Sequence, residues 1–162
     1  MIAGIVATSI GGGIGYQNRM PWPFLIEDMK WFKSLTTNNV VIMGSNTWFS
    51  LPKKLSNRVN MIISKKMIPG SDHVYMTPED AVSSAEFLYP GKDIFIIGGQ
   101  QLYESTLNLV NKFYITNINY QYTCDRFFDI QKIKDRFNTE VIHKVVDSID
   151  NIPSYTIKEY RN

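Results

Sequence analysis

Asp28 is the residue whose type and position point most directly to chemistry. On a helical projection of residues 25–36, Asp28 falls inside the apolar stripe, between Phe32 and Leu35. Its neighbour Glu27 falls on the polar side. A carboxylate on an apolar face needs a partner, or desolvation raises its pKa, so Asp28 is a candidate for ligand binding or proton transfer. The alternative is that Asp28 is a first-turn residue whose charge the helix dipole stabilises and whose side chain forms a hydrogen bond with the backbone.

Two strand-glycine-helix turns form a second candidate site. Residues 40–44 and 94–99 are apolar strands that end in glycine and precede helical patterns. Glycine lets the backbone approach a ligand closely, and free N–H groups at a helix start attract phosphate. Two such turns in one sheet suit the two ends of a dinucleotide, whereas either one alone is more simply a tight turn. Neither matches G-x-G-x-x-G or G-x-x-x-x-G-K-[ST], so the standard dinucleotide and Walker patterns are absent.

Basic residues are concentrated in one part of the chain. Between Met29 and Ser71 there are seven Lys and Arg and no Asp or Glu, although the whole chain carries a net charge of only +2. A local positive field attracts anionic ligands, and a solvated basic face is the simpler alternative. Ser64-Lys65 ends a strand in this stretch, where a hydroxyl beside an ammonium suits a phosphate monoester. Arg58 opens the same strand, and its planar guanidinium suits bidentate binding of a carboxylate.

The hydrophobic pattern predicts the elements that must position these residues. Apolar runs predict strands at residues 1–9, 40–43, 59–63, 73–76, 94–97 and 113–119, and helical periodicity predicts helices at 25–36, 46–51, 77–88 and 101–109. Alternation in 140–146 and 155–160 predicts an antiparallel hairpin. The expected fold class is α/β: a single domain over residues 1–162 with a mixed, mostly parallel central sheet flanked by helices and a C-terminal antiparallel hairpin. Ligands are expected at the carboxyl ends of the strands.

Composition narrows the class of protein. With 162 residues, 44% hydrophobic and 20% charged, the chain has the make-up of an ordinary globular domain that needs no disulfide or structural metal. The single cysteine, Cys124, fits a reducing cytoplasm, and we expect neither a signal peptide nor a membrane span. No His/Cys set has metal-ligand spacing, no G-x-S-x-G occurs, and aromatic residues do not cluster with basic ones as in RNA-binding proteins. We therefore expect no metal and no nucleic-acid partner.

Taken together, these motifs resemble the chromosomal type of the dihydrofolate reductase family. Matching segments occur in order over nearly the whole chain: Ile5-Val6-Ala7, Ile14-Gly15, Asn18 to Pro23, Asp28 with Phe32, Val41 to Gly44 with Thr47-Trp48, Arg58 to Ser64, Ile96 to Gly99 with Tyr103, and Tyr114-Ile115-Thr116. Pro-Trp-Pro and Met-Gly-x-x-Thr-Trp are specific, whereas the glycines alone are not. The resemblance implies NADPH-dependent reduction of 7,8-dihydrofolate to 5,6,7,8-tetrahydrofolate, by hydride transfer to C6 and protonation of N5, which supplies tetrahydrofolate for one-carbon and thymidylate metabolism.

The resemblance also implies a role for each matching residue. Asp28, supported by Thr116, is implied to bind the pterin and support protonation of N5, and Arg58 to bind the α-carboxylate of the glutamate tail. The implied catalytic residues are Asp28, Met20, Trp22 and Tyr103. The implied substrate-binding residues are Ile5, Asp28, Met29, Phe32, Lys53, Leu55, Arg58, Ile97 and Thr116. The implied cofactor-binding residues are Ala7, Ile14, Gly15, Asn18, Met20, Gly44, Ser45, Asn46, Thr47, Ser64, Lys65, Ile97, Gly98, Gly99, Gln100, Gln101, Leu102 and Tyr103.

The resemblance further implies a cis peptide at Gly98–Gly99, a loop around Met20 that closes over the nicotinamide, and a monomer. Some positions depart from the family pattern. Ser45 and Asn46 stand where many relatives carry basic residues, and Gln100 stands where a small residue is common. Three rival functions remain open: an NADPH-dependent reductase of another pterin or flavin-pathway substrate, a non-catalytic nucleotide-binding or scaffolding protein of the same fold, and a polyanion-binding module.

Overall fold

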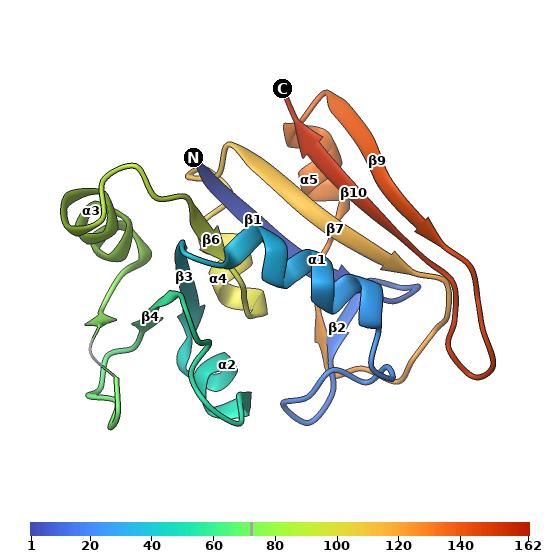
Figure 1. Cartoon of the computed structure of the whole chain (residues 1–162), viewed down its shortest axis with the longest axis horizontal. Coiled ribbons are helices and arrows are strands. Elements are labelled where there is room, and N and C mark those ends of the chain that lie inside the picture. Colours follow the sequence, from blue (N-terminus) through green and yellow to red (C-terminus); the bar gives the residue numbers. More distant parts are fainter. Residues whose placement is uncertain (72) are drawn as a thin grey trace.

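A mixed eight-stranded sheet lies at the centre of the computed structural model, which describes residues 1–71 and 73–162 (Figure 1). Its strand order is β5-β4-β3-β6-β1-β7-β10-β9. The strands are β1 (Ile2–Thr8), β3 (Val40–Gly44), β4 (Val59–Ile63), β5 (Val74–Tyr75), β6 (Ile94–Ile96), β7 (Lys112–Ile118), β9 (Thr139–Val146) and β10 (Tyr155–Arg161). Pairing is parallel from β5 through β7 and antiparallel for β7 with β10 and for β10 with β9. The predicted α/β class with its C-terminal antiparallel hairpin is therefore confirmed.

Helices pack on both faces of this sheet. They are α1 (Ile26–Thr36), α2 (Ser45–Ser50), α3 (Pro78–Leu88), α4 (Gln100–Ser105) and α5 (Gln131–Arg136). Apolar side chains of α3, α4 and α5 share one core cluster with inner strand residues such as Ile42 and Ile115. Side chains of α1 and α2, including Trp31 and Trp48, pack against a second cluster that contains Val41 and Tyr114. Successive strand residues thus point to opposite faces, and both faces are buried, as a continuous apolar run predicts.

The sequence patterns predicted the ends of most helices and strands to within one or two residues. Thr77 caps α3 as predicted, because its side chain accepts a hydrogen bond from the backbone N–H of Asp80 at 3.1 Å. The C-terminal end of the helix predicted at residues 101–109 was wrong. The buried hydroxyl of Thr106 donates back to the carbonyl of Leu102 at 2.7 Å, and the chain turns there, so α4 stops at Ser105.

Three short elements were not predicted. β2 (Gly13–Gly15) pairs with β8 (Arg126–Phe127) in a separate two-stranded ribbon, and α5 follows it. β2 and β8 are too short to show a periodic pattern, because strands of two or three residues contain barely one alternation, and α5 has only six residues. Among the residues that the structure describes, no helix is long and apolar enough to cross a membrane.

Candidate active site

Asp28 lies in the first turn of α1 and faces the sheet. Its side chain is half-buried, and Thr116 on β7 donates a hydrogen bond to its Oδ1 at 2.5 Å. Burial raises the pKa of Asp28 above its ordinary value, and the Thr116 hydrogen bond opposes this rise by stabilising the carboxylate. Glu27 instead pairs with Lys144 and Lys30 at the surface. The two neighbouring carboxylates therefore point in opposite directions, as the helical projection predicts.

Apolar side chains pack on the same face of the sheet as α1. Ile5 on β1, Leu55 and Ile97 are partly buried and pack against the core cluster to which Trp31 of α1 also belongs. Met29 and Phe32, which the resemblance places against the substrate, are also partly buried on α1. The structure thus brings residues from four separate segments to the face of the sheet that carries Asp28.

Arg58 lies at the start of β4, against the far end of α1. Its Nε donates to the carbonyl of Ser56 at 2.9 Å, and its Nη1 donates to the hydroxyl of Thr36 at 3.1 Å. The guanidinium carbon lies 5.9 Å from the ring centre of Phe32. Partial burial lowers the pKa of Arg58 from its ordinary value, which leaves it a cation at neutral pH. Arg58 therefore has a fixed position with no carboxylate within ion-pair distance among the residues that the structure describes.

A recess of about 200 Å³ opens beside Arg58. It is lined by Trp48, Lys54, Arg58, Val59, Asn60, Gly70, Ser71, His73 and Tyr89. Lys53, which the resemblance places near the substrate tail, is exposed and does not line this recess, whereas its neighbour Lys54 does.

The two glycine turns meet at the carboxyl ends of β3 and β6. The N–H of Gly44 donates to the carbonyl of Gly98 at 2.8 Å, which holds the two turns side by side. The Gly98–Gly99 peptide is cis, as the resemblance implies. A Cβ on Gly98, where φ is +114°, would lie 3.0 Å from the Tyr103 hydroxyl, so only glycine fits. α2 and α4 both begin at this point, and neither first turn has a side-chain cap.

Tyr103 lies beneath this junction and is fully enclosed by protein. Its hydroxyl donates to the carbonyl of Ile5 at 2.7 Å, and its ring packs near Phe113 and Phe128. Burial raises the pKa of Tyr103 far above its ordinary value, so the phenol stays neutral. The side chain of Leu102 is buried in the same core cluster, which leaves only its backbone for ligand contact.

A second recess, of about 360 Å³, follows the carboxyl end of β4. It is lined by Ser64, Lys65, Lys66, Met67, Ile68, Ser71, Val74, Tyr75 and Met76. The Ser64 hydroxyl accepts a hydrogen bond from the N–H of Lys66 at 3.0 Å, and both lysines are exposed. Among the lining residues that the structure describes, Lys65 and Lys66 carry positive charge and none carries a carboxylate.

The segment around Met20 connects β2 to α1. The Met20 side chain is 59% exposed, whereas Trp22 is buried with its ring edge-on to Tyr122, at a centroid distance of 6.2 Å. Ile14, Ala7 and Gly15 are partly buried near the start of this segment, and Asn18 is exposed with positive φ.

Asp125, which bonds to the segment around Met20, was not predicted from the sequence. The carboxylate of Asp125 accepts a hydrogen bond from the N–H of Gln17 at 2.9 Å, and the N–H of Asp125 donates to the carbonyl of Gly15 at 2.9 Å. Gln100 reaches the same ribbon, since its side-chain oxygen accepts from the N–H of Phe127 at 3.4 Å. Nothing in the spacing of Asp125 marks it, because its partners lie more than 100 residues away in the chain.

Comparison with known proteins places this arrangement in a family. The sequence model described as "Dihydrofolate reductase" matches residues 1–161. The viral dihydrofolate reductase of Saimiriine herpesvirus 2 (strain 488) is 34% identical over 172 residues, covering 96% of this chain and 78% of its own. Dihydrofolate reductase type 9 of Escherichia coli is 38% identical (80% and 77% covered), and the Buchnera aphidicola dihydrofolate reductase is 37% identical (83% and 83%). The chain therefore belongs to the dihydrofolate reductase family.

Proposed function

We propose that the chain, as a dihydrofolate reductase, uses NADPH to reduce 7,8-dihydrofolate to 5,6,7,8-tetrahydrofolate, with Asp28 as the residue that binds and orients the pterin. The observation that carries this proposal is the half-buried Asp28 carboxylate, held by Thr116 at 2.5 Å on an otherwise apolar face. A carboxylate in a poorly solvated site makes strong, directional hydrogen bonds to a ring that presents an amino group and an N–H side by side.

Asp28 also governs the proton that the reaction consumes. Because burial raises its pKa, its protonation state changes closer to neutral pH than that of an exposed Asp. In the proposed mechanism Asp28 promotes protonation of N5 of the substrate, directly or through a water molecule. The reduction should therefore slow as pH rises, because the proton becomes less available.

Arg58 and Phe32 would bind the other end of the substrate. The Phe32 ring lies beneath the Arg58 guanidinium, so a ligand that runs along α1 from Asp28 meets first an apolar surface and then a cation. This order suits an aromatic linker that ends in a carboxylate. Ile5, Leu55, Ile97 and Met29 would supply the apolar contacts, and Lys53 remains a predicted contact at the exposed end.

The residues present also fit NADPH. When bound, it supplies the hydride that is transferred to C6. At the junction of Gly44 with Gly98–Gly99 the glycines carry no side chains, and the first turns of α2 and α4 have no side-chain cap, which suits the pyrophosphate. Thr47 is adjacent to Gly99, and Ser45, Asn46, Gln100 and Gln101 lie in these first turns. Ser64 and Lys65 line a recess one strand further along the sheet, together with Lys66, and there they would bind the 2′-phosphate.

The Met20 segment would cover the nicotinamide and exclude water. Backbone groups of Ala7 and Ile14 would bind the carboxamide, with Gly15, Asn18 and Trp22 in the covering segment and Tyr103 behind the nicotinamide. The tether from Asp125 to Gln17 supports this role, because it holds the base of the segment while Met20 itself stays exposed. We further propose that the protein acts as a cytoplasmic monomer without a nucleic-acid partner, consistent with its single cysteine and its net charge of +2.

The test is consumption of NADPH by the purified protein with dihydrofolate, then with other reduced pterins and with flavin-pathway intermediates. The expected result is turnover with dihydrofolate that greatly exceeds turnover with the other substrates. Equal or faster turnover of another pterin would favour the rival reductase on the same fold, and binding of NADPH without any turnover would favour a non-catalytic protein.

A further inference from the structure

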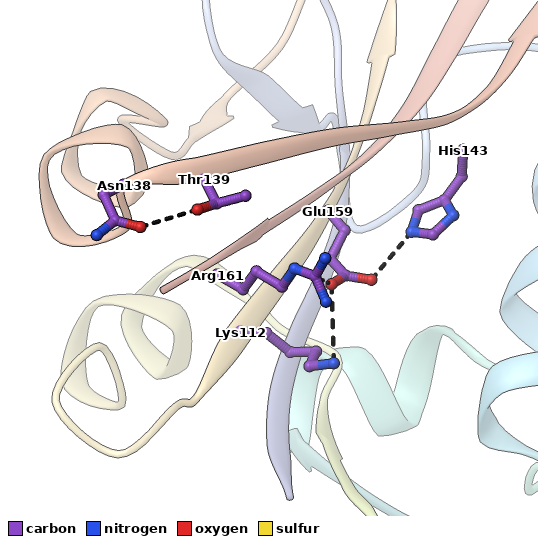
Figure 2. Close-up of polar contacts among 6 residues, drawn as sticks. All are labelled: Lys112, Asn138, Thr139, His143, Glu159 and Arg161. Atoms are coloured by element: carbon purple, nitrogen blue, oxygen red, sulfur yellow. Dashed lines mark hydrogen bonds and ion pairs between the residues drawn. The ribbon is translucent and has the colours of Figure 1, made fainter.

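Glu159 is a buried carboxylate that the proposed mechanism does not use. It lies on β10 and is 6% exposed. Its Oε1 lies 2.9 Å from Nε2 of His143 on β9, and its Oε2 lies 3.7 Å from the Lys112 ammonium and 3.4 Å from Nε of Arg161 (Figure 2). The Lys112 and Arg161 cations and the His143 ring nitrogen, from three strands, therefore compensate the cost of burying this charge.

The His143 ring that Glu159 holds packs against α1. Its centroid lies 4.8 Å from that of Trp31, with 39° between the ring planes. The Tyr114 ring packs edge-on against Trp31 and at a tilt against His143. The buried indole N–H of Trp31 has no hydrogen-bond partner in the part of the chain that the structure describes. Packing without a hydrogen bond thus sets the position of the Trp31 side chain, and of its two ring contacts the one with His143 has the shorter centroid distance.

Two further contacts join the same hairpin to the start of α1. The Tyr155 hydroxyl on β10 accepts a hydrogen bond from the N–H of Glu27 at 3.2 Å, at a helix start where Leu25 offers no side-chain cap. Lys144, next to His143 on β9, pairs with the Glu27 carboxylate. The β9–β10 hairpin therefore holds α1 on both sides of Asp28, at Glu27 and at Trp31.

From these contacts we propose that His143 and Glu159 are positioning residues for the reaction: Glu159 orients the His143 ring, the ring fixes Trp31, and the helix so held sets the depth of Asp28 against Thr116. This inference rests on the proposed function. It assigns a task in catalysis to the outer hairpin, which carries none of the residues expected to touch substrate or cofactor. Small displacements of a catalytic group are costly, so a loosened helix should slow the reaction without any loss of a ligand contact.

Two substitutions separate the ring from the hydrogen bond. His143→Gln keeps an amide donor for Glu159 but removes the ring, and His143→Phe keeps a ring against Trp31 but cannot bond Glu159. Glu140→Gln is the matched control on the same hairpin. Glu140 accepts hydrogen bonds from Tyr160 and Lys158, and Tyr160 belongs to the core cluster on the opposite face of the sheet.

His143→Gln should lower kcat/KM for dihydrofolate about three- to tenfold and leave KM for NADPH unchanged. The midpoint of its rate–pH profile should move to lower pH, because a less buried Asp28 has a less elevated pKa. Tyr155 on β10 interacts electrostatically with Asp28, whereas the Glu27 carboxylate points away toward Lys144, and both residues stay in place in this variant. His143→Phe should shift the profile less than His143→Gln does but not restore it fully, because its ring still packs against Trp31 while Glu159 no longer orients it. Glu140→Gln should lower the melting temperature without altering either quantity.

Wild-type kinetics and an unshifted profile in His143→Gln would overturn the inference, as would the same shift in Glu140→Gln. If His143→Phe fails to fold, His143→Gln decides the matter, because its amide still satisfies the buried carboxylate. A wild-type protein that does not reduce dihydrofolate would instead refute the proposed function, so the two failures are distinguishable.

Discussion

Thr116 on β7 donates a hydrogen bond to Asp28 on α1 across 2.5 Å, and the two residues are 88 positions apart in the chain. Thr116 also stands opposite Ala7 in the parallel pair of β1 and β7. The carboxylate thus sits over the middle of the sheet with one oxygen already held. Among the residues that the structure describes, its other oxygen makes no hydrogen bond, and we take this pair as the reference point for the predictions below.

Asp28→Asn should lower the turnover of dihydrofolate by about 10²- to 10⁴-fold, the usual range for loss of general acid–base assistance. The amide oxygen can still accept from Thr116, so the fold and the affinity for NADPH should be retained. Steady-state kinetics and cofactor titration measure the two effects. Turnover equal to that of the wild type would refute the proposed role of Asp28 in proton transfer.

The same substitution should change how stability depends on pH. Burial raises the folded-state pKa of Asp28, so the folded wild type binds more protons than the unfolded chain between the ordinary pKa and the raised one. This contribution to wild-type stability is fully present below the ordinary pKa of Asp and is lost as pH rises through the folded-state pKa. Urea unfolding should therefore show that the free energy of unfolding of Asp28→Asn rises relative to that of the wild type as the pH increases from acid to neutral. A difference in this free energy that stays constant with pH would contradict the assignment.

Arg58→Leu should weaken dihydrofolate binding about ten- to hundredfold, as expected when a charge-assisted hydrogen bond to a carboxylate is lost. The aliphatic side chain can still pack against Phe32, so the protein should fold. Arg58→Lys, which keeps the charge but not the planar donor pair, should recover part of the affinity. A rise in KM for NADPH with no change for dihydrofolate would place Arg58 at the cofactor instead.

Lys65→Ala should raise KM for NADPH by about tenfold or less, because an exposed lysine contributes modestly to anion binding. KM for NADH should stay the same, since NADH lacks the 2′-phosphate. Because both KM values are measured with the same variant, NADH serves as the control for any general damage to the protein. Equal changes with both would show that Lys65 does not contact the 2′-phosphate, and a larger effect from Lys66→Ala would move the contact to its neighbour.

Asp125→Ala should loosen the segment that carries Met20. The variant loses the side-chain acceptor for Gln17 but keeps the backbone bond to Gly15, so the Gln17 amide should exchange faster with solvent while the β2–β8 ribbon persists. We expect kcat to fall and hydrogen exchange to rise only in this segment. Asp129→Ala is the matched control, because Asp129 makes a similar bond to the N–H of Gln131 at 3.0 Å outside the site.

Local patterns in the sequence predicted most of the sheet and the inward face of α1. Apolar runs of five to eight residues and the 3.6-residue period report directly on which side chains must be buried, so β4 and α3 were placed almost to the residue. The inward orientation of Asp28 followed from the same period, and the glycines that end β3 and precede α4 marked the turns. The family resemblance, carried by motifs rather than periodicity, supplied the reaction.

Only the tertiary structure decided which distant groups meet. The adjacency of Gly44 and Gly98 depends on β6 pairing beside β3, the β2–β8 ribbon joins segments too short to show a period, and Asp125 reaches Gln17 across the chain. The burial of Glu159 is the plainest case, because a glutamate side chain is seldom fully buried without charged or hydrogen-bonding partners. Its charge is tolerated only because Lys112, His143 and Arg161 surround it once β7, β9 and β10 have paired. Periodicity records how each segment faces the core, whereas these contacts depend on strand order and register, which no single segment encodes.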